Sequence, residues 1–168
     1  QFLAYQHYIE GSSSIALMDW EERTTTHLAA TKVISTRGLS WHSDGRWLVF
    51  TDQPQQRGPF RLFRLDIESR AVIPLGPDLE GIHGDLYPRI SSNGNQLAFF
   101  RARVGGTGLF MFDQERGDLF LANIDGSHSR QLTHLDRAIL GLSWNEAGTH
   151  LLFVSRNEAS RMWELCRL

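Results

Sequence analysis

The 168-residue sequence is poor in several features that would narrow its function. Cys166 is the only cysteine, so a disulfide framework within the chain is excluded. Lys32 is the only lysine, and 17 basic against 19 acidic side chains give a net charge of −2, which provides no field to gather nucleic acid. The longest apolar runs span about four residues, far below the roughly 20 needed to cross a bilayer. We therefore expect neither direct nucleic-acid binding nor a membrane span in this segment.

Motifs of common enzyme chemistries are also missing. The sequence has no Gly-x-Ser-x-Gly nucleophile elbow, no Gly-x-x-x-x-Gly-Lys phosphate loop and no His-Glu-x-x-His zinc helix. His128 and His134 have no cysteine nearby and are better explained as surface histidines than as metal ligands. His83 and Asp85 lie close to Tyr87 and allow an acid–base pair, but polar residues are common in loops. The sequence predicts no enzyme activity, cofactor or metal.

What the sequence does contain is a repeated unit. Each copy has a strand ending in Trp or Ile, a tight turn at a glycine, and a second strand with alternating apolar residues. The three copies are residues 40–50, 89–99 and 143–153. Their turn glycines, Gly45, Gly94 and Gly148, are 49 and 54 residues apart. These spacings lie at or slightly above the upper end of the roughly 40 to 50 residues of one four-stranded propeller blade, so each unit is expected to hold four strands and a longer loop.

Turn and edge residues add detail to this repeat. Asp44-Gly45 and Asn93-Gly94 are typical of tight hairpins, because such pairs tolerate positive φ angles. In the third copy Ala147 precedes the turn glycine, which predicts a looser turn. Pro74 cannot donate a ladder hydrogen bond, so its strand is expected at the outer edge of a sheet.

Further strands complete the units. Third strands are expected at 61–66, 118–123 and 161–165, fourth strands at 71–75 and 129–133, and residues 2–5, 15–20 and 26–30 match the last three strands of an earlier unit. We therefore expect one all-β domain over residues 1–168, a β-propeller with four-stranded antiparallel blades, forming a partial ring of about 3.5 to 4 blades and about fourteen strands. The predicted blades span approximately residues 1–32, 33–76, 84–134 and 137–168. The first blade lacks its inner strand, and the fourth lacks its outer strand.

The two incomplete units allow several explanations. Propellers protect their edges by closing into rings of about four to eight blades. Either this chain is a stretch of a larger propeller, or its missing strands are supplied by closure or by a second copy. We expect the first.

The repeat resembles the TolB-type, or WD-like, propeller repeat of bacterial proteins. The resemblance is carried by Trp41-His42-Ser43-Asp44-Gly45, by Ile124-Asp125-Gly126 and by Arg130-Gln131-Leu132-Thr133. The chain departs from the family pattern at His42-Ser43 and at Asn145-Glu146-Ala147. The resemblance implies a propeller fold and protein partners, since TolB interacts with periplasmic and outer-membrane proteins.

Residues 139–165 are particularly similar to the propellers of CadC-like transcriptional regulators. This resemblance implies a non-enzymatic sensor or protein-interaction module, located outside the cytoplasm as part of a membrane-bound regulator. Two alternatives stay open: a TolB-like periplasmic scaffold, and the substrate-gating propeller of a prolyl-oligopeptidase-like serine peptidase. A flanking winged helix and membrane span, signal peptide or hydrolase domain would discriminate among them, because the fold alone does not.

Candidate partner-binding residues come from the loops expected on one face of the propeller and from an insertion at 102–117. Tyrosine and arginine are often energetically important at interfaces, although ordinary solvated loops would also explain such residues. The insertion has apolar residues beside glycines, which predicts either a docking arm or a long packed hairpin. The candidates are Arg37, His83, Asp85, Tyr87, Arg137, Leu109, Phe110, Met111 and Phe112. We expect a protein partner or self-association.

Overall fold

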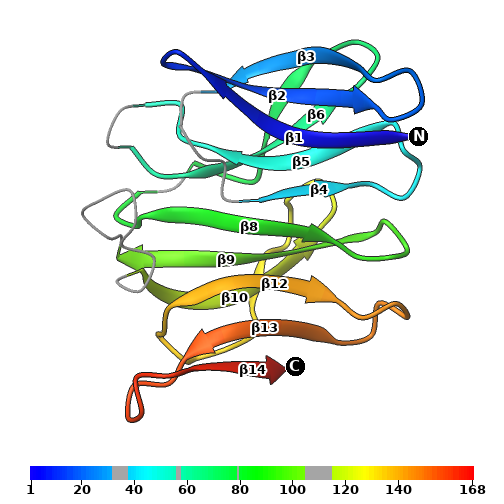
Figure 1. Cartoon of the computed structure of the whole chain (residues 1–168). Coiled ribbons are helices and arrows are strands. Elements are labelled where there is room, and N and C mark those ends of the chain that lie inside the picture. Colours follow the sequence, from blue (N-terminus) through cyan, green and yellow to red (C-terminus); the bar gives the residue numbers. More distant parts are fainter. Residues whose placement is uncertain (32–37, 56–57, 79, 105–114) are drawn as a thin grey trace.

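The computed structural model describes residues 1–31, 38–55, 58–78, 80–104 and 115–168. These residues form fourteen strands, in four antiparallel sheets, and the described part of the chain contains no helix. Figure 1 shows the sheets stacked one over another, with the N-terminal sheet at the top and the C-terminal sheet at the bottom. The predicted all-β class and partial propeller are confirmed.

Each sheet is a meander in which every strand pairs with the next one along the chain. The first sheet contains β1 (Phe2–Ile9), β2 (Ser12–Asp19) and β3 (Thr24–Thr31). The second contains β4 (Leu39–Trp41), β5 (Trp47–Asp52), β6 (Arg61–Asp66) and β7 (Val72–Leu75). The third contains β8 (Gly84–Ile90), β9 (Gln96–Val104), β10 (Arg116–Asn123) and β11 (Arg130–Gln131). The fourth contains β12 (Ile139–Trp144), β13 (Leu151–Arg156) and β14 (Trp163–Arg167).

The three repeat copies form the hairpins β4–β5, β8–β9 and β12–β13, but the looser turn expected in the last one is wrong. The amide of Gly148 donates to the Asn145 carbonyl at 2.9 Å, and Gly45 and Gly94 donate to carbonyls three residues earlier at 3.0 and 2.8 Å. Only the glycine of each turn has a positive φ. The position before it therefore has no special conformational requirement, and Ala147 fits there.

Three apolar cores lie between successive sheets because side chains alternate across each strand. On β5, Leu48 and Phe50 belong to the core shared with the first sheet, whereas Val49 belongs to the core shared with the third. On β9, Phe99 packs toward the second sheet and Phe100 toward the fourth. Complete burial of such a side chain contributes about 1.5 to 3 kcal/mol. The inner sheets therefore contribute to two cores each.

The edges of the sheets also follow the predicted pattern. Pro74 lies on β7, the outermost strand of the second sheet, where it pairs with Phe63. At the insertion, β9 and β10 extend the ladder as far as the pair Val104 and Arg116. None of the described segments forms a helix with the length and apolarity needed to span a bilayer.

Backbone hydrogen bonds join the second sheet to the third. The Phe60 amide donates to the His83 carbonyl at 2.9 Å, and the Asp85 amide donates to the Phe60 carbonyl at 3.0 Å. Gly84 lies between these bonds with φ of 131°, and a Cβ atom there would overlap the backbone of Phe60. Only glycine satisfies both the backbone angle and the close approach.

We predict that Gly84→Ala lowers the free energy of unfolding by about 3 kcal/mol, because it adds a steric overlap to an unfavourable φ. Gly11→Ala is the matched control: Gly11 also has a positive φ, of 83°, but no atom lies within 4 Å of the added Cβ. Gly11→Ala should lower the free energy of unfolding by about 1 kcal/mol, because only the backbone angle is unfavourable there. Urea unfolding measures both values, and equal losses would show that the contact with Phe60 is unimportant.

Candidate functional site

The structure brings only some of the predicted partner-binding residues together. His83 directly precedes β8, Asp85 and Tyr87 lie within this strand, and Arg137 precedes β12 at the same end of the strands as His83. The remaining candidates lie outside the described residues, so their role stays a prediction: Arg37, Leu109, Phe110, Met111 and Phe112.

Asp85 was expected in an accessible loop, and this is wrong. It lies in β8 and is only 7% exposed. Its carboxylate accepts hydrogen bonds from Nε and Nη2 of Arg101 at 2.8 and 2.9 Å. The Arg101 guanidinium in turn lies over the ring of Phe120, 4.5 Å from its centroid. Burial raises the pKa of Asp85, and the hydrogen bonds and charge of Arg101 oppose this shift. Asp85 is thus a structural residue that joins β8 to β9.

Tyr87 was also expected in a loop, but it is a strand residue that is only 9% exposed. The ladder between β8 and β9 shifts register between Leu86 and Arg89, and Tyr87 has a positive φ of 55° at this bulge. Its ring lies 6.3 Å from that of Phe100, within the core between the third and fourth sheets. The bulge directs this side chain into the protein rather than toward a partner.

His83 is half-buried and remains accessible. Its ring meets the ring of Phe60 edge-on, with 5.0 Å between centroids. Its Nε2 atom lies 3.6 Å from Oε1 of Glu115, a carboxylate that is almost completely buried. The sequence allowed an acid–base pair of His83 with Asp85, but in the structure His83 pairs with Glu115 and Asp85 pairs with Arg101.

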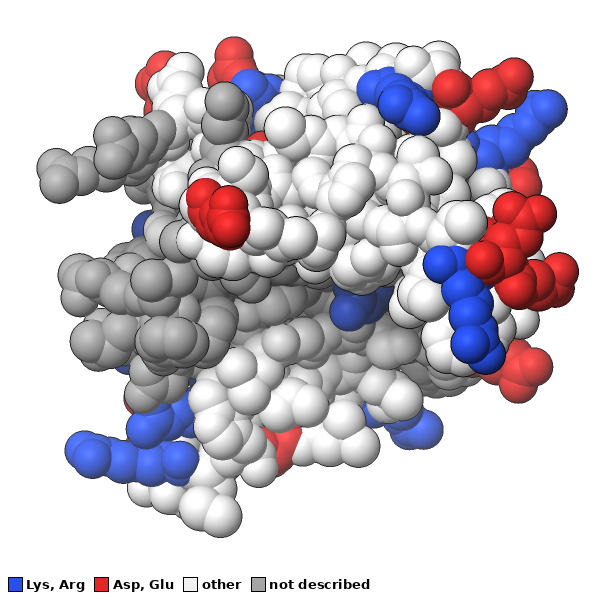
Figure 2. All heavy atoms as spheres, turned by 45° about the horizontal axis from the view of Figure 1, so that its top comes forward, with Lys and Arg blue, Asp and Glu red and all other residues white. Residues whose placement is uncertain are grey.

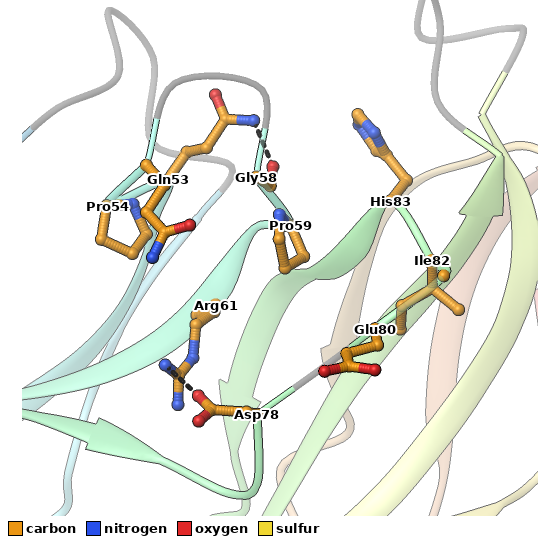
Figure 3. Close-up of a pocket in the computed structure, with 11 residues that line it drawn as sticks. Gln53, Pro54, Gly58, Pro59, Arg61, Asp78, Glu80, Ile82 and His83 are labelled. Atoms are coloured by element: carbon orange, nitrogen blue, oxygen red, sulfur yellow. Dashed lines mark hydrogen bonds and ion pairs between the residues drawn. The ribbon is translucent and has the colours of Figure 1, made fainter.

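A pocket of about 650 Å³ opens beside His83 (Figure 3). One wall is lined by residues 53–55, 58 and 59, and the other by residues 80–83. Between them Arg61 and Asp78 point toward each other, with 2.5 Å between Nη1 and Oδ1. The Gln53 amide donates to the Gly58 carbonyl at 2.6 Å, which closes the first wall. The pocket is thus built from the second sheet and the segment that leads into the third.

Paired charges continue from the pocket along the same end of the sheets. Arg103 reaches Asp136 at 2.6 Å and the buried Asp118 at 3.4 Å, and its hydrogen bond lowers the pKa of Asp136. Arg137 lies 3.3 Å from Glu164, so this predicted candidate also belongs to an ion pair. The opposite charges within each of these ion pairs neutralise each other. By contrast, the Asp78 side chain is 85% exposed although it contacts Arg61, and it can accept a further cation.

The residues that line the pocket determine what it can bind. Within the described ranges, no three His, Cys, Asp or Glu side chains are grouped so that they could hold a metal ion. Its lining is mostly polar, with Pro54, Pro59 and Ile82 as apolar elements. Enclosed small-molecule sites are usually lined mainly by apolar side chains. An open polar pocket is better suited to a side chain or short segment of another protein.

Comparison with solved structures shows the fold of the chain. It superposes on TolB from Acinetobacter baumannii with a TM-score of 0.74 and 17% identity, covering 99% of this chain and 37% of that one. For a TolB-like protein from Agrobacterium tumefaciens the TM-score is 0.76 and the identity 19%, and the superposition covers 98% of this chain and 56% of that one. For the tricorn protease the TM-score is 0.57 and the identity 11%, and the superposition covers 96% of this chain and 15% of that one. No family model and no curated protein matches the sequence.

These likenesses confirm the predicted TolB-type propeller at the level of the fold. The chain spans 37% and 56% of the two TolB structures, so it corresponds to part of such a protein. The similarity to CadC-like regulators is not shown by these structures and rests on the sequence motifs alone.

Sequence reasoning identified His83 but missed Arg61, Asp78 and Glu80, which also line the pocket. The available signal was acidic residues in the connection between the second and third units, at 78–80. Arg61 carries no such signal, because an arginine at the start of a strand is commonplace. Its role depends on the return of the chain after β7, which places Asp78 beside it.

We predict that Asp85→Ala lowers the free energy of unfolding by about 3 kcal/mol, because Arg101 would keep its charge in a largely buried site without a partner. Asp78→Ala removes the same group from an exposed ion pair and should lower the free energy of unfolding far less. Chemical denaturation of both variants measures the difference. A small loss for Asp85→Ala would contradict a structural role and return Asp85 to the list of functional candidates.

Proposed function

We propose that this chain is a non-enzymatic protein-interaction module, which binds a segment of a partner protein in the pocket between the second and third sheets. The observation that carries this proposal is an open, polar pocket of about 650 Å³ at a junction of two sheets, with an exposed carboxylate at Asp78. The TolB-type fold supports it, because propellers present binding surfaces at the ends of their strands.

The pocket favours a basic side chain from the partner. Asp78 and Glu80 are exposed acidic groups on its rim, and a guanidinium or ammonium group would satisfy their free oxygen atoms. Pro54, Pro59 and Ile82 provide apolar surface along which the methylene stem of such a side chain would lie. Arg61 holds Asp78 in place from the opposite side. We therefore expect an extended segment with Arg or Lys at the position that enters the pocket.

The wider role in our proposal is that of a sensor located outside the cytoplasm, as the resemblance to CadC-like membrane-bound regulators implies. A TolB-like periplasmic scaffold is the first alternative and uses the same kind of surface. The likeness to the tricorn protease favours a second alternative, a propeller attached to a peptidase. A winged helix and membrane span in the same gene product would support the sensor, whereas a hydrolase domain would support the peptidase.

The pocket can be tested with a displayed library of random peptides panned against the 168-residue chain. We expect the enriched peptides to share a basic residue, and Asp78→Arg to weaken their binding at least tenfold, about 1.4 kcal/mol, because it reverses the charge on the rim. Fluorescence anisotropy with one labelled peptide measures the affinities.

Glu146→Arg is the control variant for this experiment. It changes the net charge by the same amount, but Glu146 is exposed in the β12–β13 turn at the opposite end of the strands. It should leave peptide affinity unchanged. Enriched peptides without a basic residue, or equal weakening by both variants, would contradict a binding site at the pocket.

A further inference from the structure

A second pocket, of about 320 Å³, lies at the opposite end of the strands from the pocket beside His83. It is formed where β4, β8 and β12 lead into their hairpin turns, and β8 contacts β4 on one side and β12 on the other. Trp41 and Trp144 line it from the two flanking strands, and Arg89 lines it from β8. The second, third and fourth sheets therefore supply its walls, away from the outer faces of the stack.

Hydrogen bonds hold these three strands together around the second pocket. The Trp144 indole donates to the Arg89 carbonyl at 3.1 Å, which joins β12 to β8. The Ile90 amide donates to the Ser40 hydroxyl oxygen at 2.9 Å, which joins β8 to β4. The walls are thus fixed within this chain before any ligand enters, which reduces the entropy lost on binding.

The Arg89 guanidinium is anchored through only one of its nitrogen atoms. Its Nη1 donates to the Pro88 carbonyl at 2.8 Å and to the Leu39 carbonyl at 3.3 Å. These two bonds use both N–H groups of Nη1, and among the described residues Nε and Nη2 have no acceptor. Burial lowers the pKa of Arg89, and no carboxylate in the described part of the chain opposes this shift. Arg89 is therefore a half-buried cation whose Nε–Nη2 edge has no counter-ion.

Arg101, on the adjacent strand β9, shows what such an edge binds. Its Nε and Nη2 donate to the two carboxylate oxygens of Asp85 at 2.8 and 2.9 Å. This two-point geometry matches a carboxylate closely. Figure 2 shows that several basic groups at the rim of the molecule also lie beside acidic ones. An ion pair is formed by each of these arginines: Arg61, Arg101, Arg103, Arg116 and Arg137. Arg89 differs from them, and burying a charge without a partner is costly.

We propose that the second pocket binds a small molecule that carries one carboxylate group, with Nε and Nη2 of Arg89 donating to its two oxygen atoms. The volume lies at the lower end of the roughly 300 to 1,000 Å³ of small-molecule sites, so the ligand is small. This inference goes beyond the proposed function, because it concerns another end of the strands and a ligand of the opposite charge.

The other lining residues define the rest of the ligand. Trp41, Ile90 and Trp144 supply apolar and aromatic surface, which favours an apolar or aromatic body beside the carboxylate. Glu146 is the only acidic residue among the described residues of the lining. Its negative charge disfavours a ligand with several negative charges. A monocarboxylate should therefore bind more tightly than inorganic phosphate.

Phenylacetate and phenylacetamide test this proposal, because they share one shape and only the first carries a carboxylate. The Nε–H signal of Arg89 in nitrogen-15 NMR spectra of the 168-residue chain, assigned through its own backbone, reports binding directly. We expect phenylacetate to shift this signal saturably, with an affinity at least about tenfold above those of phenylacetamide and inorganic phosphate. The absence of a saturable shift, or equal affinities for phenylacetate and phenylacetamide, overturns the proposal. Tighter binding of phosphate overturns the preference for a single carboxylate.

Two variants of Arg89 separate its geometry from its charge. Arg89→Gln should abolish phenylacetate binding, followed by tryptophan fluorescence, and Arg89→Lys should weaken it at least about tenfold, because an ammonium group keeps the charge but lacks the two-point edge. Arg130→Gln is the matched control, since Arg130 is exposed on β11 and its loss changes the net charge equally. It should bind like the wild type. Circular dichroism checks that each variant is folded, and a folded Arg89→Gln variant with wild-type affinity overturns the proposal.

Discussion

The alternation of side chains between the two faces of a strand is the property on which the rest of this structure depends. On β9, Leu97 and Phe99 pack toward the second sheet, while Ala98 and Phe100 pack toward the fourth. An inner sheet therefore stabilises both neighbours, and its apolar residues have no solvent-facing side. The first and fourth sheets follow the same alternation but meet a neighbour on one side only, which is why each presents an apolar outer face.

The ends of the strands are organised by charge instead of apolar packing. Asp85 and Arg101 form a largely buried pair, whose attraction is offset by the loss of hydration, so its main effect is to hold β8 and β9 in one register. Near the fourth sheet, Arg103 joins Asp118 and Asp136 in the same way. Most carboxylates at this end are therefore occupied within the chain. The exposed acidic rim of the pocket differs from them, and this difference gives the pocket its expected preference for a cation.

The alternation of side chains and the pairing of charges give this chain two different kinds of surface. The pocket lies at one end of the strands, where backbone loops and charged side chains meet solvent, whereas the outer sheet faces are extended and apolar or uncharged.

The sequence by itself determined the class of the fold, the order of the strands and the edge position of Pro74, because these depend on local alternation and on turn chemistry. It misplaced Asp85 and Tyr87, because β8 begins at Gly84 only through its pairing with β9 and its bridge to Phe60, contacts between distant residues. The sequence did not predict the pocket either. Arg61 and Asp78 are commonplace residues along the chain, and only the tertiary structure decided that they meet, because docking one sheet on the next brings their segments together.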